Sequence, residues 1–284
     1  MEEEFFINNK ILMLFVILLA SFVVIGASSA AEINDDISVD NVAATNIVTD
    51  EIDSVGTGAD DGVVEVDNEA DLKSAINNDS VKEIKITKDI TLSESLKVPV
   101  SHSYLKIDGQ NHKFSASANF VAQKFGGALY WDGVNGTLTN CVFSGFNSPN
   151  IENGGAICWN NTYGSITNCN FVNCAAKNGG AIYYATVNGL IKNCKFTNNV
   201  AKKEGNSIYI EGIGVTVDGC KFSQTHKDYS DCEIYVYGTC EDINIINNVM
   251  LTKAPMQGYA AVHLDDLGYV YYWAYLAFDN NKFK

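Results

Sequence analysis

Short runs of alternating apolar and polar residues recur along most of the chain. In the run from Ile191 to Phe196, apolar positions alternate with Lys192 and Lys195, and Asn193 marks a turn between two halves. Such period-two runs, bounded by Gly and Asn, are typical of short β-strands. No unit of about 25 residues holds a helical stripe of ten or more residues, which disfavours repeats built from helix pairs.

Two phrases recur together along the chain. The first reads GGALYW at 126–131, GGAICW at 154–159 and GGAIYY at 179–184, and fades to GNSIYI at 205–210 and DCEIYV at 231–236. The second, of the form NC-x-F, recurs at positions 141, 169, 194, 220, 248 and 281, with gaps of 28, 25, 26, 28 and 33 residues. A period in this range indicates a solenoid, in which each repeat buries its apolar face against its neighbours.

The repeat length predicts a parallel β-helix. Two or three short strands with tight turns use about 25 residues and return the chain to its start one strand spacing higher, roughly 4.8 Å. Equivalent side chains should then stack in columns. The expected aliphatic column comprises Leu129, Ile157, Ile182, Ile208, Ile234 and Val262.

Three further columns are expected inside the coil. The sulfur column is Cys141, Cys169, Cys194 and Cys220; the aromatic column is Phe143, Phe171, Phe196 and Phe222, then Met250 and Phe283; the amide column is Asn140, Asn168 and Asn193, then Asn247 and Asn280, interrupted by Gly219. Asn tolerates left-handed backbone, and stacked amides can hydrogen-bond along the axis. The Gly pairs of the first phrase supply turns of positive φ.

The motifs resemble those of known surface proteins. The GGAI phrase, the NC-x-F phrase and FTNN at Phe196–Asn199 are similar to the repeats of archaeal, methanogen-type adhesin-like proteins and of the chlamydial polymorphic membrane protein family. IDG at Ile107–Gly109 resembles the start of many pectin-lyase-like β-helices. The likeness covers about residues 120–250 and departs at Cys174, where the motif has Asn, and in the last two coils. It implies an all-β, right-handed parallel β-helix and an adhesin-like role, but no one activity.

The N-terminal third of the chain divides into segments. Residues 1–31 are expected to be an export signal, because Ile11–Ala27 is an apolar run of 17 residues followed by small residues. An uncleaved N-terminal membrane anchor stays an alternative, since the flank is acidic. Residues 32–62 contain nine acidic residues, no Lys and no aromatic residue, which predicts a disordered spacer. The β-helix domain is then 63–284.

Both ends of the solenoid need cover, because an open strand edge pairs with other chains. EADLKSAI at 69–76 predicts a short amphipathic cap helix with Asn68 as N-cap. At the other end, the aromatic stretch Gly268–Phe278 has three open interpretations: packing of the last coil, a docking surface for end-to-end self-association, or a sugar-stacking platform formed by Tyr271, Tyr272 and Trp273.

The net charge narrows the classes of partner that the chain can bind. The net charge of −15 argues against nucleic acid and against anionic membrane surfaces as partners.

Eight cysteines in an exported chain suggest disulfides. However, neighbours in a column lie about 4.8 Å apart, beyond the roughly 3.8 Å between Cβ atoms that a disulfide prefers. Free column thiols are therefore expected, and Cys232 and Cys240 are candidates for a disulfide across a turn. No metal or other cofactor is expected, since the chain has no CxxC and its four His are scattered.

Catalysis finds little support in the sequence. Many proteins of this fold cleave acidic polysaccharides, but the chain has no Arg, and within residues 63–284 it carries a single pair of adjacent Asp residues of the kind that glycoside hydrolysis requires, Asp265 and Asp266, near His263. A solvated turn is the ordinary explanation of that pair.

The preferred hypothesis is a non-catalytic, secreted or cell-surface adhesin-like protein that binds a glycan or protein of another cell or of the envelope. The alternatives are a polysaccharide lyase or hydrolase and a structural envelope module that assembles end to end. Asn78, Asn135 and Asn160 begin sequons that permit glycosylation on export.

Overall fold

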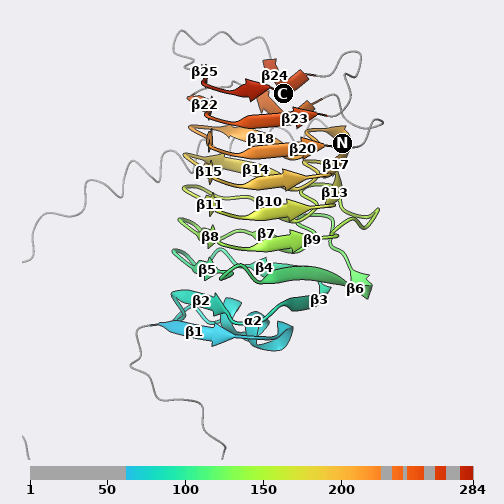
Figure 1. Cartoon of the computed structure of the whole chain (residues 1–284). Helices are drawn as coiled ribbons and strands as arrows, with labels where there is room; N and C mark the ends of the chain where they lie inside the picture. Colours follow the sequence, from blue (N-terminus) through green and yellow to red (C-terminus); the bar gives the residue numbers. More distant parts are fainter. Residues whose placement is uncertain (1–61, 225–231, 239–241, 253–259, 267–275, 284) are drawn as a thin grey trace, which may run out of the picture. The chain divides into compact units, whose positions relative to one another are not determined.

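Strands from successive turns of the chain lie parallel, one above the next, and form three long sheets (Figure 1). The computed structural model describes residues 62–224, 232–238, 242–252, 260–266 and 276–283. All of them belong to one compact unit of the chain. Every pairing between the described strands is parallel, for example β10 with β7 and β14, so the all-β parallel β-helix predicted from the repeat period is confirmed.

Each sheet collects one strand from each turn of the coil. Sheet A consists of β1 (Val63–Val66), β2 (Glu83–Ile86), β5 (Lys106–Asp108), β8 (Thr137–Thr139), β11 (Ser165–Thr167), β15 (Leu190–Lys192), β19 (Thr216–Asp218), β22 (Ile243–Ile246) and β25 (Leu276–Asp279). Sheet B consists of β3 (Ile90–Glu94), β6 (Lys113–Val121), β9 (Val142–Ser144), β12 (Asn170–Val172), β16 (Lys195–Thr197), β20 (Lys221–Gln224), β23 (Val249–Thr252) and β26 (Lys282–Phe283).

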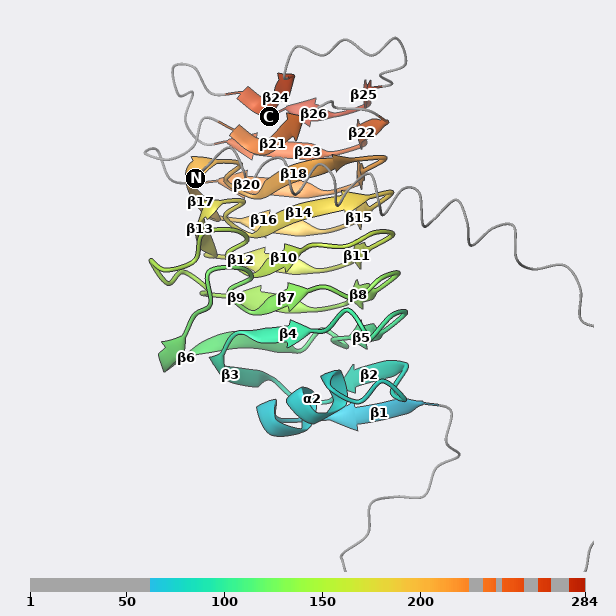
Figure 2. The same ribbon diagram turned by 180° about the vertical axis from the view of Figure 1, so that it is seen from behind.

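The coil passes from the third sheet through sheet A to sheet B, as in β7, β8 and β9. Sheet C consists of β4 (Leu96–Val98), β7 (Leu129–Trp131), β10 (Ile157–Trp159), β14 (Ile182–Val187), β18 (Ile208–Ile213), β21 (Cys232–Gly238) and β24 (Ala260–Asp266). A short sheet D, β13 (Ala175–Asn178) with β17 (Val200–Glu204), follows sheet B at one side of the stack (Figures 1 and 2).

The interior is built from like side chains stacked in register. The aliphatic column occupies one register position of sheet C, from Leu129 through Ile157, Ile182 and Ile208 to Ile234. The aromatic column stacks in sheet B: the ring centroids are 5.4 Å apart from Phe143 to Phe171, 5.1 Å from Phe171 to Phe196 and 4.8 Å from Phe196 to Phe222. Phe114 extends it downward, 5.1 Å from Phe143.

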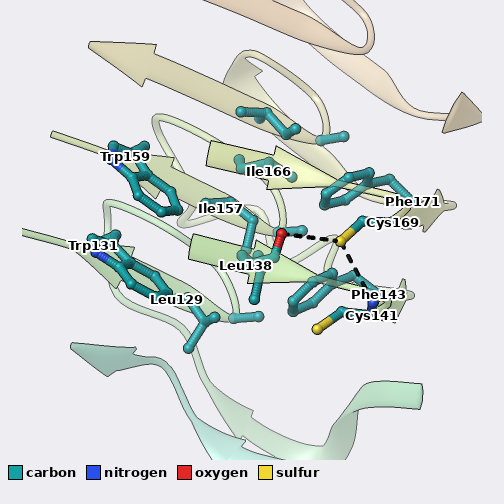
Figure 3. Close-up of a cluster of buried hydrophobic side chains, with 14 of the residues drawn as sticks. Leu129, Trp131, Leu138, Cys141, Phe143, Ile157, Trp159, Ile166, Cys169 and Phe171 are labelled. Carbon is teal, nitrogen blue, oxygen red and sulfur yellow. Dashed lines mark hydrogen bonds between the residues drawn. The ribbon is translucent and has the colours of Figure 1, made fainter. Parts of the chain in front are cut away.

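A tryptophan pair fills the corner between sheets C and A. Trp131 and Trp159 stack with centroids 4.3 Å apart and an interplanar angle of 7°, and both are fully buried (Figure 3). The turn after each tryptophan must leave room for the indole. A Cβ on Gly164 would lie 2.2 Å from Nε1 of Trp159, so glycine is required there.

Turns with left-handed backbone occur where the sequence places Asn. Asn140, Asn168 and Asn193 have φ of 53°, 54° and 53°, and Gly219 takes the same conformation at 64°. Along the axis, the Asn280 Nδ2 donates to Asn247 Oδ1 at 2.7 Å. The amide of Asn140 instead donates to the carboxylate of Asp108, at 3.0 Å. The hydrogen bonds of the amide column therefore run partly to carboxylates.

The sulfur column forms hydrogen bonds to the backbone of the turn below. The Cys141 N–H donates to the Cys169 Sγ at 3.5 Å, and that thiol faces the Leu138 carbonyl oxygen at 3.8 Å (Figure 3). In the next turns, the thiols of Cys194 and Cys220 face the carbonyl oxygens of the equivalent residues. All four column thiols are buried and free. Burial raises the pKa of the Cys169 and Cys220 thiols, which keeps them protonated as donors.

Cys174, which departs from the repeat motif, forms hydrogen bonds of the same kind at the neighbouring corner of the coil. Its N–H donates to Asn199 Oδ1 at 3.0 Å, and the Asn199 Nδ2 donates to the Phe171 carbonyl at 3.1 Å. The Cys174 thiol faces the Phe143 carbonyl one turn lower, at 3.9 Å. A buried thiol thus occupies the place of an amide.

The predicted cap helix is present as α2 (Glu69–Ile76). Asn68 is its N-cap, and its Oδ1 accepts a hydrogen bond from the Asp71 N–H at 3.0 Å. Leu72, Ala75 and Ile76 are buried against the first strands. One difference is that β1 precedes the helix and pairs with β2, so the segment before the helix already belongs to the coil. In the described part of the chain, no helix is long and apolar enough to cross a membrane.

Candidate functional site

A column of tyrosines follows the outward positions of sheet C. Tyr183, Tyr209 and Tyr235 share one register position on β14, β18 and β21. The same position holds Cys158 on β10 and Tyr130 on β7. Because side chains alternate across a strand, these residues point away from the aliphatic column. We call this surface the tyrosine face.

The tyrosine rings stack on one another. The centroids of Tyr183 and Tyr209 are 4.9 Å apart at 11°, and those of Tyr209 and Tyr235 are 5.0 Å apart at 25°. Tyr237 lies beside Tyr209, with centroids 6.3 Å apart. Since the ring faces contact each other, the half-buried Tyr183 and Tyr209 offer ring edges and hydroxyl groups to a ligand rather than open faces for sugar stacking, whereas Tyr235 is buried.

Polar groups accompany the tyrosines on the adjacent outward positions. The Tyr183 hydroxyl donates a hydrogen bond to the Glu211 carboxylate. Lower on the face, the Asn160 Nδ2 donates to the Tyr130 hydroxyl at 3.0 Å and to Asp132 Oδ1 at 3.3 Å. Phenol, amide and carboxylate groups thus lie together on the outer face of sheet C.

A lysine closes the lower end of the tyrosine face. Lys97 Nζ lies 3.0 Å from Asp132 Oδ2 and 5.1 Å from the centroid of the Tyr130 ring. A cation in this position is held by both the carboxylate and the ring quadrupole. The charge of Asp132 is therefore partly neutralised within the face itself.

The tyrosines remain neutral over a wide pH range. Burial, reinforced by the neighbouring Asp132, raises the pKa of Tyr130 to about 12. Burial and then the Glu211 charge raise the pKa of Tyr183 and Tyr209 further. Burial also raises the pKa of the Cys158 thiol. Raised pKa values keep Tyr130, Tyr183, Tyr209 and Cys158 protonated, so none of these four groups is activated as a nucleophile.

The residues proposed for catalysis lie on the last strand of sheet C. The backbone of His263, Asp265 and Asp266 belongs to β24 and pairs with Tyr235, Tyr237 and Gly238 of β21. The expectation that the Asp pair lies in a turn is therefore wrong, because parallel pairing with β21 extends the strand through both residues. Their side chains lie outside the described part of the structure.

The other predicted site residues are dispersed. Tyr271, Tyr272 and Trp273 lie outside the described residues, as does Cys240, the suggested partner of the buried Cys232. Among the sequons, Asn78 is exposed after α2 and Asn160 is exposed on the tyrosine face. Asn135 is half-buried in a left-handed turn with φ of 54°. Within the described ranges, no group of three or more His, Cys, Asp or Glu could hold a metal ion.

Sequence reasoning missed the tyrosine face, although the first phrase contains its signal. The residue after the buried aliphatic position is Tyr130, Tyr183, Tyr209 or Tyr235 in four of the five copies. This Tyr recurs once per turn and directly follows an inward residue. Such a position is expected to form a column on the outer face of the sheet.

Comparisons with known proteins agree with this architecture. A model of the family described as a pectate lyase-like adhesive domain matches residues 63–209, slightly more than half of the chain. The chain belongs to this family. A pectate lyase-like adhesive domain is named for adhesion and not for catalysis, which makes the chain adhesin-like and associates it with binding at a surface.

Two further comparisons add less. No curated protein matches the chain. A solved structure described as L. reuteri 53608 SRRP shares 13% sequence identity over 78% of this chain and 98% of that chain, with a TM-score of 0.32.

Proposed function

We propose that the protein is exported and binds a glycan or protein of another cell or of the envelope through the tyrosine face, without catalysis. The observation that carries the proposal is the column of stacked tyrosines beside Glu211, with Tyr130, Asp132 and Asn160 lower on the same face of sheet C. Phenol hydroxyls, amides and carboxylates are donors and acceptors suited to sugar hydroxyls and to polar protein surfaces. Membership of an adhesive family supports this role.

The rigidity of the solenoid supports recognition by a preformed surface. Each tyrosine sits on a strand paired on both sides, and its inward neighbours Ile182 and Ile208 are fully buried. A side chain held this way loses little conformational entropy when a ligand binds, which favours affinity. Repetition along the axis adds contact area without new folding elements.

The N-terminal segments fit the same proposal. In our interpretation, residues 1–31 direct export and are either cleaved or retained as a membrane anchor, and the acidic residues 32–62 separate the domain from the surface. Archaeal origin is part of the proposal, and it rests on the repeat motifs alone.

The test is binding of the full-length protein to glycan arrays and to whole cells. We expect Tyr183→Phe combined with Tyr209→Phe to weaken binding by about tenfold, because two hydroxyl contacts are lost while the ring stack is kept. Thr197→Val on sheet B is the matched control, since it removes a hydroxyl from another outward position. Equal loss in the control, or unchanged binding in the double variant, would contradict a role for the tyrosine face.

The same protein distinguishes the alternatives. Activity on uronic-acid or neutral polysaccharides that disappears with Asp265→Ala and Asp266→Ala would establish an enzyme instead. Oligomers that grow with concentration in light scattering, with no binding to glycans or cells, would establish an assembly module.

A further inference from the structure

A hollow lies on a different side of the solenoid from the tyrosine face, along sheet D. It encloses about 510 Å³ between the loop that precedes β7, the loop that precedes β10, and the strands β13 and β17. Figures 1 and 2 show β13 and β17 stacked at this side, above the end of β6. Its polar lining comprises Gln123, Lys124, Asn150, Glu152, Lys177 and Lys202.

The charged residues of this hollow come from four successive turns. Phe125, Asn153 and Asn178 form parallel bridges, so the residues before them, Lys124, Glu152 and Lys177, follow one another along the axis. A bulge between Ala176 and Asn178 then sets Lys177 opposite Lys202 and Lys203 of β17. The sequence separates Lys124 from Lys202 widely, and only the coil brings them to one site.

The positive charge of the hollow is not compensated by its own lining. The lining carboxylate, Glu152, pairs with Lys124, with 3.3 Å between Oε1 and Nζ. Lys177 and Lys202 are exposed, and within the described residues neither forms an ion pair. Two lysines on adjacent turns repel each other, and an anion placed between them relieves that repulsion.

We propose that this hollow binds one acidic sugar residue, bearing a carboxylate or a sulfate, at the end of a surface glycan. Lys177 and Lys202 pair with the anion, and the amides of Gln123 and Asn150 contact the ring hydroxyls. The volume suits a ligand of one or two sugar rings rather than a long polymer, because sites for small molecules span about 300–1,000 Å³. The inference rests on the proposed adhesive function and adds a second site of different chemistry.

The tyrosine face and the hollow would divide recognition by charge. The tyrosine face presents neutral phenols with carboxylates, which disfavour an anion, whereas the hollow presents ammonium groups. Nucleic acid is a poorer fit for the hollow, because a phosphate backbone requires a longer row of cations. Binding through lysines should weaken as salt is added, since charges at a surface are screened over about 10 Å at 0.1 M ionic strength.

The experiment is calorimetric titration of the full-length protein with three oligosaccharides of equal length. One ends in an uronic acid, one in a sulfated hexose and one in a neutral hexose. We expect at least one acidic ligand to bind about tenfold or more tightly than the neutral ligand, and its affinity to fall with salt. Comparison of the two acidic ligands tells carboxylate from sulfate.

A matched pair of charge-reversal variants locates the site. Lys177→Glu with Lys202→Glu should abolish binding of the acidic ligand. Lys195→Glu with Lys221→Glu makes the same change in net charge at exposed lysines on adjacent turns of sheet B, and it should leave affinity within about twofold. Lys177→Gln with Lys202→Gln should give an intermediate loss, and circular dichroism of each variant reports the fold.

Each other result overturns the proposal. Equal loss in the two Glu variants would show attraction by overall charge, and equal affinity for acidic and neutral ligands would show no anion site. Tighter binding of a single-stranded oligonucleotide would assign the hollow to nucleic acid. If acidic ligands fail while cells are still bound through the tyrosine face, the hollow alone is refuted. If cell binding fails as well, the adhesive function fails with it.

Discussion

At the scale of single residues, buried thiols and buried amides at the corners of the coil form hydrogen bonds to equivalent backbone groups. Asn248 continues the sulfur column: its Oδ1 accepts from the Cys220 N–H at 2.8 Å, and its Nδ2 donates to the Val217 carbonyl at 3.0 Å. The thiols of the column reach equivalent partners at longer distances. What the corner requires is a small side chain that accepts from one backbone group and donates to another.

This equivalence predicts the outcome of two substitutions at Asn248. Asn248→Val should lower the free energy of unfolding by about 1–3 kcal/mol, because it leaves a buried N–H and a buried carbonyl unsatisfied. Asn248→Cys should cost clearly less, since a thiol reproduces both contacts weakly. Urea denaturation of both variants measures the difference, and the idea fails if Cys is as damaging as Val.

At the scale of elements, the cap helix is held by a buried histidine from the next turn. His102 is 1% exposed, and its Nδ1 and Nε2 lie 2.7 Å and 2.6 Å from the carbonyl oxygens of Ile76 and Val81. Ile76 is the last residue of α2, where a helix leaves carbonyl groups without partners. The imidazole therefore joins the end of the helix to the loop that leads from α2 to β2.

Removal of this imidazole should destabilise the cap. His102→Leu is expected to lower the free energy of unfolding by about 1–3 kcal/mol, because it leaves carbonyl oxygens buried without a donor. His102→Gln keeps one amide donor and should cost less. The half-buried His112 is the control, and His112→Leu should change stability by less than about 0.5 kcal/mol. Equal effects of the two Leu variants in chemical denaturation would refute the link between His102 and α2.

The elements also show how far the sequence alone could lead. The spacing of Phe143 and Phe171 fixes which strands pair, because one residue per turn at one register position leaves a single alignment. Helix α2 was predictable from its N-cap and apolar stripe. Sheet D and the hollow beside it were not predicted, although Lys124, Glu152, Lys177 and Lys202 recur at gaps of 28, 25 and 25 residues, which match the repeat period. That period places the four residues on successive turns, but it does not say that the loops before β7 and β10 leave a hollow between them.

At the scale of the whole molecule, the solenoid places different chemistry on different sides. Ionised side chains mostly lie at the surface: Asp218 forms an ion pair with Lys192 at 2.8 Å, and this pair and Asn247 lower the pKa of Asp218. Such exposed pairs contribute little to stability. The tyrosines, by contrast, are stacked over several turns and partly removed from water. The pH dependence of folding should therefore be governed on the alkaline side by the tyrosine face.

That argument predicts cooperative unfolding at high pH. An unfolded tyrosine loses its proton near pH 10, whereas the pKa of Tyr130 is raised to about 12 and those of Tyr183 and Tyr209 are raised by burial and Glu211. The folded state therefore holds the proton more tightly than the unfolded state. Below pH 10 both states keep the proton, so this pKa difference makes the free energy of unfolding neither rise nor fall with pH. Above pH 10 the unfolded chain loses the proton first, and the free energy of unfolding falls as pH rises.

Substitution tests the assignment to these residues. Tyr183→Phe with Tyr209→Phe should raise the midpoint of alkaline unfolding, because two groups whose ionisation favours the unfolded chain are removed. At neutral pH the same variant should be slightly less stable, by about 1 kcal/mol, since Tyr183 no longer donates to Glu211. Tyr104→Phe with Tyr163→Phe, at exposed positions, should leave the midpoint unchanged. Far-ultraviolet circular dichroism and phenolate absorbance, followed together against pH, measure both events. Because the stacked tyrosines are partly buried on the paired strands of sheet C, their ionisation requires these strands to unfold, and the two signals should change together. Ionisation of these residues near pH 10 in a chain that stays folded would show that the column is open to water.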